Sequence, residues 1–140
     1  TKFKIAADEY PSSDAGIFAR YRLAGTHMAL GDAKSAADAY QQVVDRAGDS
    51  LYGQMARLGL AEAQAQTGAV DQAIATYTEL AQLKDGPIPV DGVLLRLARS
   101  YLDAGKKGDA EKALTRLVEE FPESPFAAEA KRTLDEIKKA

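Results

Sequence analysis

The sequence predicts an all-α fold: an α-α superhelix, or solenoid, of three helical hairpins with a partial helix before them and a capping helix after them. Two observations support this prediction. Alanine, which has the highest helix propensity, supplies about a fifth of the 140 residues. In addition, one pattern of small, aromatic and glycine residues recurs along the chain at a constant spacing, and self-similarity at a fixed period is typical of solenoids.

The repeat has a period of 37 residues. Gly31, Gly68 and Gly105 occupy the same place in three successive copies. The other positions that match across the copies are Leu23-Ala24 with Leu60-Ala61 and Leu97-Ala98, Ala36 with Ala73 and Ala110, Tyr40 with Tyr77 and Leu114, and Val43 with Leu80 and Leu117. We therefore predict a single domain over residues 1–140, with repeats at 13–48, 49–85 and 88–122.

Each repeat is predicted to contain two helices joined at the glycine. In the first repeat, Ser13 or Asp14 can cap the first helix and Asp32 can cap the second, because their side-chain oxygens accept hydrogen bonds from free backbone N–H groups. Gly31 lies between these helices, where a helix end commonly requires a left-handed residue. The same order of signals predicts two helices in each of the other repeats.

The ends of the chain and one connector have signals of their own. Residues 1–11 are expected to be the last part of a helix from a preceding repeat, in a chain that continues upstream. Residues 124–139 are expected to form the capping helix, with Ser124 as its N-cap and Pro125 in its first turn. The two prolines of residues 86–89 predict an extended connector between the second and third repeats.

The third repeat matches a known pattern. The tetratricopeptide pattern places Trp-x2-Leu-Gly-x2-Tyr in the first helix, Ala-x3-Phe in the second and Pro after it, with a period of about 34 residues. The corresponding residues here are Leu94, Leu97, Ala98, Tyr101, Ala110, Leu114 and Pro122. The chain therefore resembles a tetratricopeptide repeat (TPR) protein. It departs from the pattern in its longer period and in the residues at the Trp and Tyr positions of the first two repeats, which are Arg20, Arg57, His27 and Gln64.

A second resemblance rests on a shorter motif. Residues 121–130, which begin Phe-Pro-Glu-Ser-Pro-Phe, and the looser Tyr10-Pro11-Ser12-Ser13 resemble segments of bacterial cell-envelope members of this family. Those members include the Tol–Pal coordinator, the lipoprotein of the outer-membrane β-barrel assembly machine and the ancillary subunit of the SecYEG translocon. The resemblance implies a periplasmic or envelope-associated domain that is membrane-anchored through an upstream N-terminal helix. A cytoplasmic location stays open.

Composition and charge argue against several classes of function. The net charge is −3 and the isoelectric point about 5.2. Basic runs do not exceed pairs such as Lys106-Lys107, whereas nucleic-acid binding needs a concentrated positive surface. No apolar stretch approaches the length of about 18 residues that predicts a membrane-spanning helix. Because cysteine is absent, the sequence has neither a disulfide nor a thiolate metal site.

The sequence contains no pattern typical of catalysis. His27 is the single histidine; by the repeat alignment it takes an aromatic core position, and it lacks a nucleophile or further metal ligands at suitable spacing. The acidic pairs Asp8-Glu9 and Glu119-Glu120 are adjacent on solvated helical faces, so neither holds two acids across a cleft. The glycines form no phosphate-binding loop. We therefore predict that the chain is not an enzyme and has no catalytic residue, metal site or cofactor.

The binding surface is predicted to lie on the concave face, which the first helix of each hairpin lines in a solenoid. The resemblance places there Phe18, Tyr21, Gly25 and Met28 from the first repeat, Met55, Leu58, Glu62 and Gln66 from the second, Leu95, Arg99 and Asp103 from the third, and Glu129 and Arg132 from the capping helix. The first rows are apolar, which suits an extended peptide or a helix of a partner protein. Neighbouring helices or an upstream segment could instead cover these side chains.

Three hypotheses for the function follow. The first is a protein–protein interaction scaffold that binds a peptide segment or a partner protein on the concave face. The alternative is a self-association module in which residues 3–10 pair with another copy to form a homo-oligomer. The third is an enzyme hidden in the groove, for which the sequence offers only the scattered Glu62, Arg99 and Asp103, too few converging groups for a catalytic site.

Overall fold

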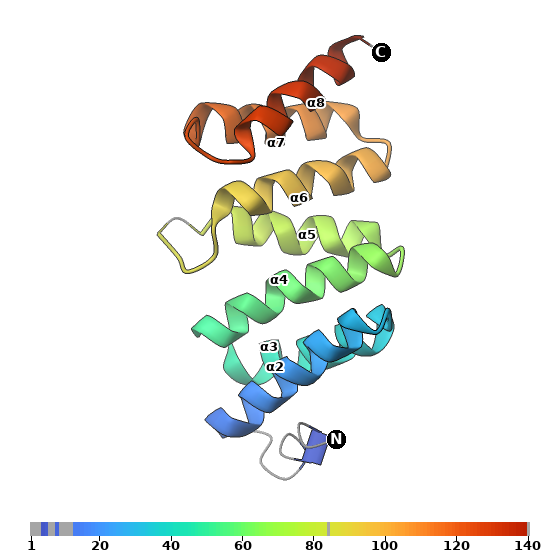
Figure 1. The fold of residues 1–140 in the computed structure, drawn as a ribbon, viewed down its shortest axis with the longest axis vertical. Helices are drawn as coiled ribbons and strands as arrows, with labels where there is room; N and C mark the ends of the chain where they lie inside the picture. The colour runs from blue at the N-terminus through green and yellow to red at the C-terminus, as the bar shows by residue number, and fades with distance from the viewer. Residues whose placement is uncertain (1–3, 6–7, 9–12, 84, 140) are drawn as a thin grey trace. The chain divides into compact units, whose positions relative to one another are not determined.

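The computed structural model describes residues 4–5, 8, 13–83 and 85–139. Within these residues the secondary structure is helical and contains no strand (Figure 1), which confirms the predicted all-α class. The helices are α2 (Asp14–Ala29), α3 (Ala33–Ala47), α4 (Leu51–Gln66), α5 (Val70–Ala81), α6 (Val90–Asp103), α7 (Lys107–Glu120) and α8 (Ala127–Lys139). None of these described helices is long and apolar enough to cross a membrane.

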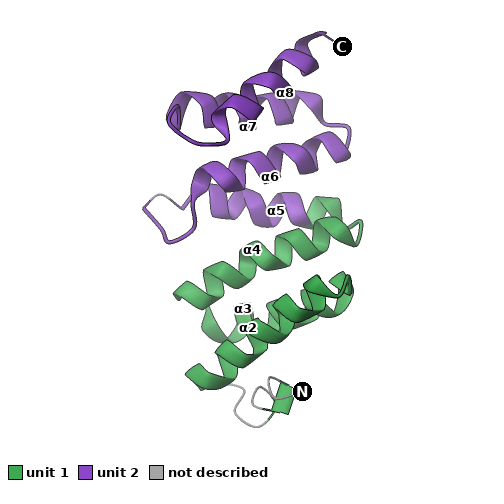
Figure 2. Ribbon diagram, viewed as in Figure 1, with its two compact units in different colours: residues 1–72 green, residues 73–140 purple. Residues whose placement is uncertain are grey.

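The chain divides into two compact units, Thr1–Gln72 and Ala73–Ala140 (Figure 2). In the first unit α2, α3 and α4 pack against one another. In the second unit α7 packs against both α6 and α8. The single domain and the repeat boundaries predicted from the sequence stay predictions.

The turns and caps of the first unit form as the sequence predicts. Ser13 caps α2, since the Gly16 amide donates to the Ser13 Oγ over 3.0 Å. Asp32 caps α3 by accepting a 3.1 Å hydrogen bond from the Ser35 amide. Gly31, between the two helices, has a φ of +80°, which a residue with a Cβ adopts only at a cost. The equivalent glycines, Gly68 and Gly105, have φ values of +84° and +74°.

The arginines that stand where the tetratricopeptide pattern has Trp each contact an acidic residue of an earlier segment. Arg20 donates to Asp8 over 3.0 Å, and Arg57 donates to Asp49 over 3.2 Å. Both arginine side chains are mostly buried along their length while the head groups reach these carboxylates. Long basic side chains cover apolar surface in this way, so an arginine can partly replace the bulk of an indole.

The capping helix begins later than predicted. α8 starts at Ala127, and the three residues before it form a turn in which the Phe126 amide donates to the Ser124 Oγ over 3.1 Å. The Ser124 hydroxyl in turn donates a 2.7 Å hydrogen bond to the Asp91 carboxylate at the start of α6. Ser124 therefore accepts a hydrogen bond of the capping type from the amide two residues later, and it also links the turn to α6.

Two further segments were predicted from the sequence, the extended connector before α6 and the partial helix at residues 1–11. The connector before α6 bends over Asp85–Ile88, with a left-handed Asp85 at φ +60°, and Pro89 has an extended backbone. Asp tolerates this φ better than most residues with a Cβ. In the predicted partial helix, Lys4, Ile5 and Asp8 are helical, and the rest of residues 1–11 lies outside the described residues.

Each unit has a core of small and aliphatic side chains. In the first unit the buried residues of the central cluster are Ala24, Ala36, Ala39, Tyr40, Val43, Ala56, Leu60 and Ala63. In the second unit the most deeply buried large side chains of α6 and α7 are Val93, Leu94, Leu114 and Leu117. The alanines that recur at the same place in the three repeats, Ala24, Ala61 and Ala98, are at most 1% exposed. Buried alanines allow helix backbones to approach closely, because they add little volume between them.

Replacing Ala61 by leucine is expected to lower the free energy of unfolding by about 1–3 kcal/mol, because extra methylenes in a packed core displace their neighbours. Ala15, which is exposed on α2, provides the matched control, and Ala15→Leu should change the stability little. Urea unfolding of the two variants makes the comparison. An Ala61→Leu variant as stable as the unaltered chain would contradict the close packing at this position.

Candidate protein-binding site

Four aromatic side chains of the first unit form one cluster, Phe18, Tyr21, Tyr40 and Tyr52, which we call the aromatic cluster. Phe18 and Tyr52 pack edge to face with their ring centroids 6.0 Å apart. Tyr21 packs against both Tyr40 and Tyr52, at 5.8 Å in each pair. These distances and tilted angles are those that aromatic pairs prefer. The cluster joins α2 and α4, with Tyr40 contributed by α3.

The cluster depends on a glycine in the middle of α4. A Cβ added to Gly59 would lie 2.5 Å from the Cζ of Tyr40 and under 3 Å from two further ring atoms. The Tyr40 ring therefore lies directly on the α4 backbone, where no other residue type leaves enough space. Tyr40 is 7% exposed, so its ring is held between the helices.

Exposure differs sharply within the cluster. Tyr40 is buried, Tyr21 and Tyr52 are half-buried, and Phe18 is 43% exposed. Phe18 therefore leaves part of its apolar ring in water while one edge packs on Tyr52. The predicted surface residues Phe18 and Tyr21 thus belong to one cluster. Tyr52 packs against both of them.

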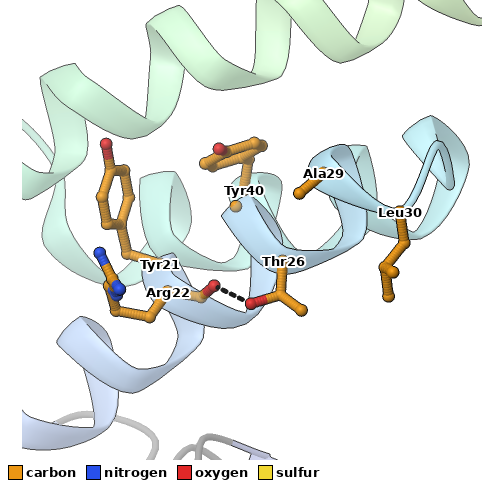
Figure 3. A pocket seen from close by; sticks show the side chains of 7 residues that line it. Tyr21, Arg22, Thr26, Ala29, Leu30 and Tyr40 are labelled. Atoms are coloured by element: carbon orange, nitrogen blue, oxygen red, sulfur yellow. Dashed lines mark hydrogen bonds between the residues drawn. The ribbon is translucent and has the colours of Figure 1, made fainter.

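A hollow of about 440 Å³ opens beside the cluster along α2. Its lining residues are Tyr21, Arg22, Gly25, Thr26, Ala29, Leu30 and Tyr40. Figure 3 shows the α2 members in a row with the ring of Tyr40 reaching them from α3. The Thr26 hydroxyl donates to the Arg22 carbonyl oxygen over 3.0 Å, so it is held by its own helix. We call this cavity the Gly25 hollow.

Burial sets the electrostatics of the two tyrosines that line the hollow. Burial raises the pKa of Tyr40 to about 12, and the neighbouring Tyr21 and the Glu62 carboxylate act in the same direction. The pKa of Tyr21 is also raised, first by burial and then by Glu62, while Arg22 opposes the shift. Both phenols therefore keep their protons at neutral pH and can donate hydrogen bonds.

The remaining predicted surface residues of the first unit differ in exposure. Met28 packs against the core cluster as a half-buried side chain. Met55, Leu58 and Glu62 are half-buried on α4, and Gln66 is exposed at its end. These four belong to one side of α4, because they are spaced by three or four residues.

In the second unit the predicted residues are mainly charged. Leu95 is 4% exposed and so offers a partner little surface. Arg99 on α6 donates a 2.6 Å hydrogen bond to Glu129 on α8, whereas Asp103 and Arg132 are exposed. Because Arg99 and Glu129 are both open to solvent, their pairing contributes at most about 1 kcal/mol to stability. Which of the predicted residues contact a partner stays a prediction.

His27 does not occupy the core position that the repeat alignment predicts. Its side chain is 30% exposed, and its Nδ1 lies 3.9 Å from the Asp32 carboxylate. Two hydrogen bonds from Ser35 lower the pKa of Asp32, and His27 adds to this effect. His27 belongs to the last turn of α2, and its ring lies beside the Asp32 cap of α3. Across the described part of the chain, no three His, Cys, Asp or Glu residues are placed to hold a metal ion.

Comparison with protein families gives a match to the tetratricopeptide repeat-like domain, over residues 2–85 and again over residues 19–135. The chain belongs to this family. Comparison with curated protein sequences gives no match.

Solved structures of other TPR proteins are similar in fold. A Podosopora anserina protein assigned as a kinesin light chain, with nearly identical TPR-like repeats, has a TM-score of 0.82 at 15% identity, covering 98% of this chain and 74% of its own. The Yersinia enterocolitica type III secretion chaperone SycD, in complex with a peptide of the translocator YopD, has a TM-score of 0.76 at 22% identity, covering 90% of this chain and 95% of its own. At these identities the likeness shows the fold, an α-α superhelix of the TPR type, as predicted.

Several members of this site were not predicted from the sequence. Tyr52, Arg22, Thr26 and Leu30 join the cluster or the hollow, although only their neighbours were assigned to the binding face. Gly59 gave a usable signal, because glycine inside a helix costs about 0.5–1 kcal/mol relative to alanine and so indicates a packing reason. The TPR pattern does not specify a glycine there, so the signal was easily overlooked.

Replacing Gly59 by alanine is expected to lower the free energy of unfolding by about 1–3 kcal/mol, since the new methyl overlaps the confined Tyr40 ring. Gly25 is the matched control, because a Cβ there would be 3.9 Å from the Tyr40 Oη, an ordinary contact. Gly25→Ala should leave the stability unchanged or raise it by up to about 1 kcal/mol through helix propensity. Denaturant unfolding that ranks the two variants in the opposite order would contradict this packing.

The pKa of Tyr40 predicts a pH dependence of stability. The phenol ionises near pH 10 in an unfolded chain and at about 12 in the folded one. Between these values the unfolded chain has lost a proton that the native chain keeps, so stability should fall as the pH rises from about 10 to 12. Thermal unfolding of the unaltered chain and of Tyr40→Phe across this range provides the measurement. Curves that remain parallel for the two proteins would show that Tyr40 does not contribute.

Proposed function

We propose that this TPR protein is a protein-interaction scaffold, and that it binds a segment of a partner protein on the face of the first unit that carries the aromatic cluster. The observation that carries this proposal is the 43% exposure of Phe18 beside Tyr52 and Tyr21. Aromatic side chains, phenylalanine among them, are enriched in the core of protein–protein interfaces. Burial of the exposed part of the Phe18 ring against a partner would therefore contribute to the free energy of binding.

The comparisons support the class of function. TPR-like folds generally mediate protein–protein interactions, and one similar structure, SycD, holds a peptide of a translocator. In this proposal the present chain likewise takes up an extended segment or a helix, as helical grooves do. It acts without catalysis and without a cofactor.

The proposal includes a location in the bacterial cell envelope. The motif at residues 121–130 and its looser counterpart near residue 10 support it through their resemblance to envelope members of the family. The partner would then be a periplasmic or membrane-associated protein. Cell fractionation tests the proposed location. Recovery of the partner only from the cytoplasmic fraction would contradict a location in the envelope.

A site-specific photo-cross-linker tests the binding surface. Benzoylphenylalanine is placed at position 18, or as a control at position 83, because Leu83 is also exposed but lies after α5. After irradiation in bacterial envelope extract, we expect one protein to be cross-linked from position 18 and not from position 83. Unlabelled native chain should compete for that partner, and unlabelled Phe18→Glu should not.

Two results would overturn the proposal. Equal cross-linking of the same protein from both positions would remove the aromatic cluster as the specific surface. Cross-linking of position 18 only to another copy of this chain would instead support the self-association module. Circular dichroism and thermal unfolding of Phe18→Glu ensure that a lost competition reflects binding and not unfolding.

A further inference from the structure

We infer that the Gly25 hollow is a subsite for one neutral aromatic side chain of the bound segment. This inference rests on the proposed function and names the chemistry that the first unit recognises. The hollow adjoins the aromatic cluster through two shared residues, Tyr21 and Tyr40. A segment lying over the exposed Phe18 would thus continue toward Gly25 along the same helix.

The size and floor of the hollow leave room for a large side chain. Its volume of about 440 Å³ is at the lower end of the range of about 300–1,000 Å³ for ligand pockets. The floor is open because residue 25 has no side chain, and the nearest atom to an added Cβ would be the Tyr40 Oη at 3.9 Å. A ring of the partner can therefore approach the α2 backbone.

The walls suit an aromatic ring in particular. Tyr21 already packs edge to face with Tyr40, and a third ring can continue this tilted arrangement. Leu30, which is 78% exposed at the far end of the hollow, adds an apolar surface that a partner would cover. An aliphatic side chain would gain from burial here, but it would not gain the directional contacts of ring edges with ring faces.

The charges around the hollow give a charged side chain no net advantage. Arg22 lines the hollow; its positive charge repels a lysine or arginine and attracts an acidic side chain. The Glu62 carboxylate is close enough to Tyr21 and Tyr40 to influence both phenols, and its negative charge repels an acidic side chain and attracts a basic one. Because these two charges have opposite signs, their effects on a bound ion of either sign partly cancel, and the ion still loses its hydration. A neutral aromatic ring does not have that cost, and its negative face attracts the guanidinium.

Analogues of side chains can test this inference without a known partner. We would titrate the uniformly ¹⁵N-labelled chain with p-cresol, indole, 3-methylbutan-1-ol, n-butylammonium and butyrate, and follow the backbone amide signals. The two aromatic probes are expected to shift the amides of Gly25 and Thr26 in a saturable way. The aliphatic alcohol and the two ions should require at least tenfold higher concentrations for the same shift.

Gly25→Leu provides the matched variant, because its side chain fills the hollow from the helix that forms it. The variant should weaken binding of p-cresol at least tenfold while its melting temperature stays equal or rises, since leucine is a better helix former than glycine. Gly25→Ala, with a methyl at ordinary contact distance, should retain most of the binding. This pair separates a filled subsite from a damaged fold.

The inference is overturned if the aliphatic alcohol or either ion binds as well as p-cresol, or if Gly25→Leu binds p-cresol like the unaltered chain. Its failure can be told apart from failure of the proposed function. Cross-linking from position 18 without aromatic-probe binding at Gly25 rejects the subsite alone. Saturable p-cresol binding at Gly25 with no partner cross-linked from position 18 supports the subsite and rejects the proposed protein-binding role of the Phe18 surface.

Discussion

The contact of the Tyr40 ring with the backbone of Gly59 determines how the helices of the first unit fit together. A large ring is accommodated between helices whose other buried contacts are largely alanines, such as Ala24, Ala36 and Ala56. Small residues bring the helices close, and the one missing side chain on α4 makes room for the ring. Because interiors are close-packed, this arrangement leaves little freedom in the relative positions of α3 and α4.

The same contact explains the surface that carries the proposed function. With Tyr40 fixed, its ring supports Tyr21, and Tyr21 packs against Tyr52. Tyr52 in turn packs against Phe18, which remains 43% exposed. Aromatic residues with few rotatable bonds form rigid contact surfaces at a low entropic cost. Little conformational entropy of this surface would therefore be lost when a partner binds.

The sequence predicted the parts of this structure that local chemistry determines. The left-handed glycines at 31, 68 and 105, the caps at Ser13 and Asp32, and the burial of the repeated alanines are consequences of backbone geometry and spacing. The hydrogen bond from Ser124 to Asp91 was not predicted, because it joins residues 33 positions apart. The Gly25 hollow was missed for the same reason, since it depends on how far the Tyr40 ring reaches across to α2.

The most direct test of the account is a double-mutant cycle between Gly59→Ala and Tyr40→Leu, measured by urea unfolding. Leucine is chosen because Leu114 occupies the equivalent place in the third repeat. If the ring and the α4 backbone are in direct contact, the alanine methyl should be tolerated once the ring is gone, and the coupling energy should be about 1–3 kcal/mol. Effects that add to within about 0.5 kcal/mol would contradict the contact on which the aromatic cluster depends.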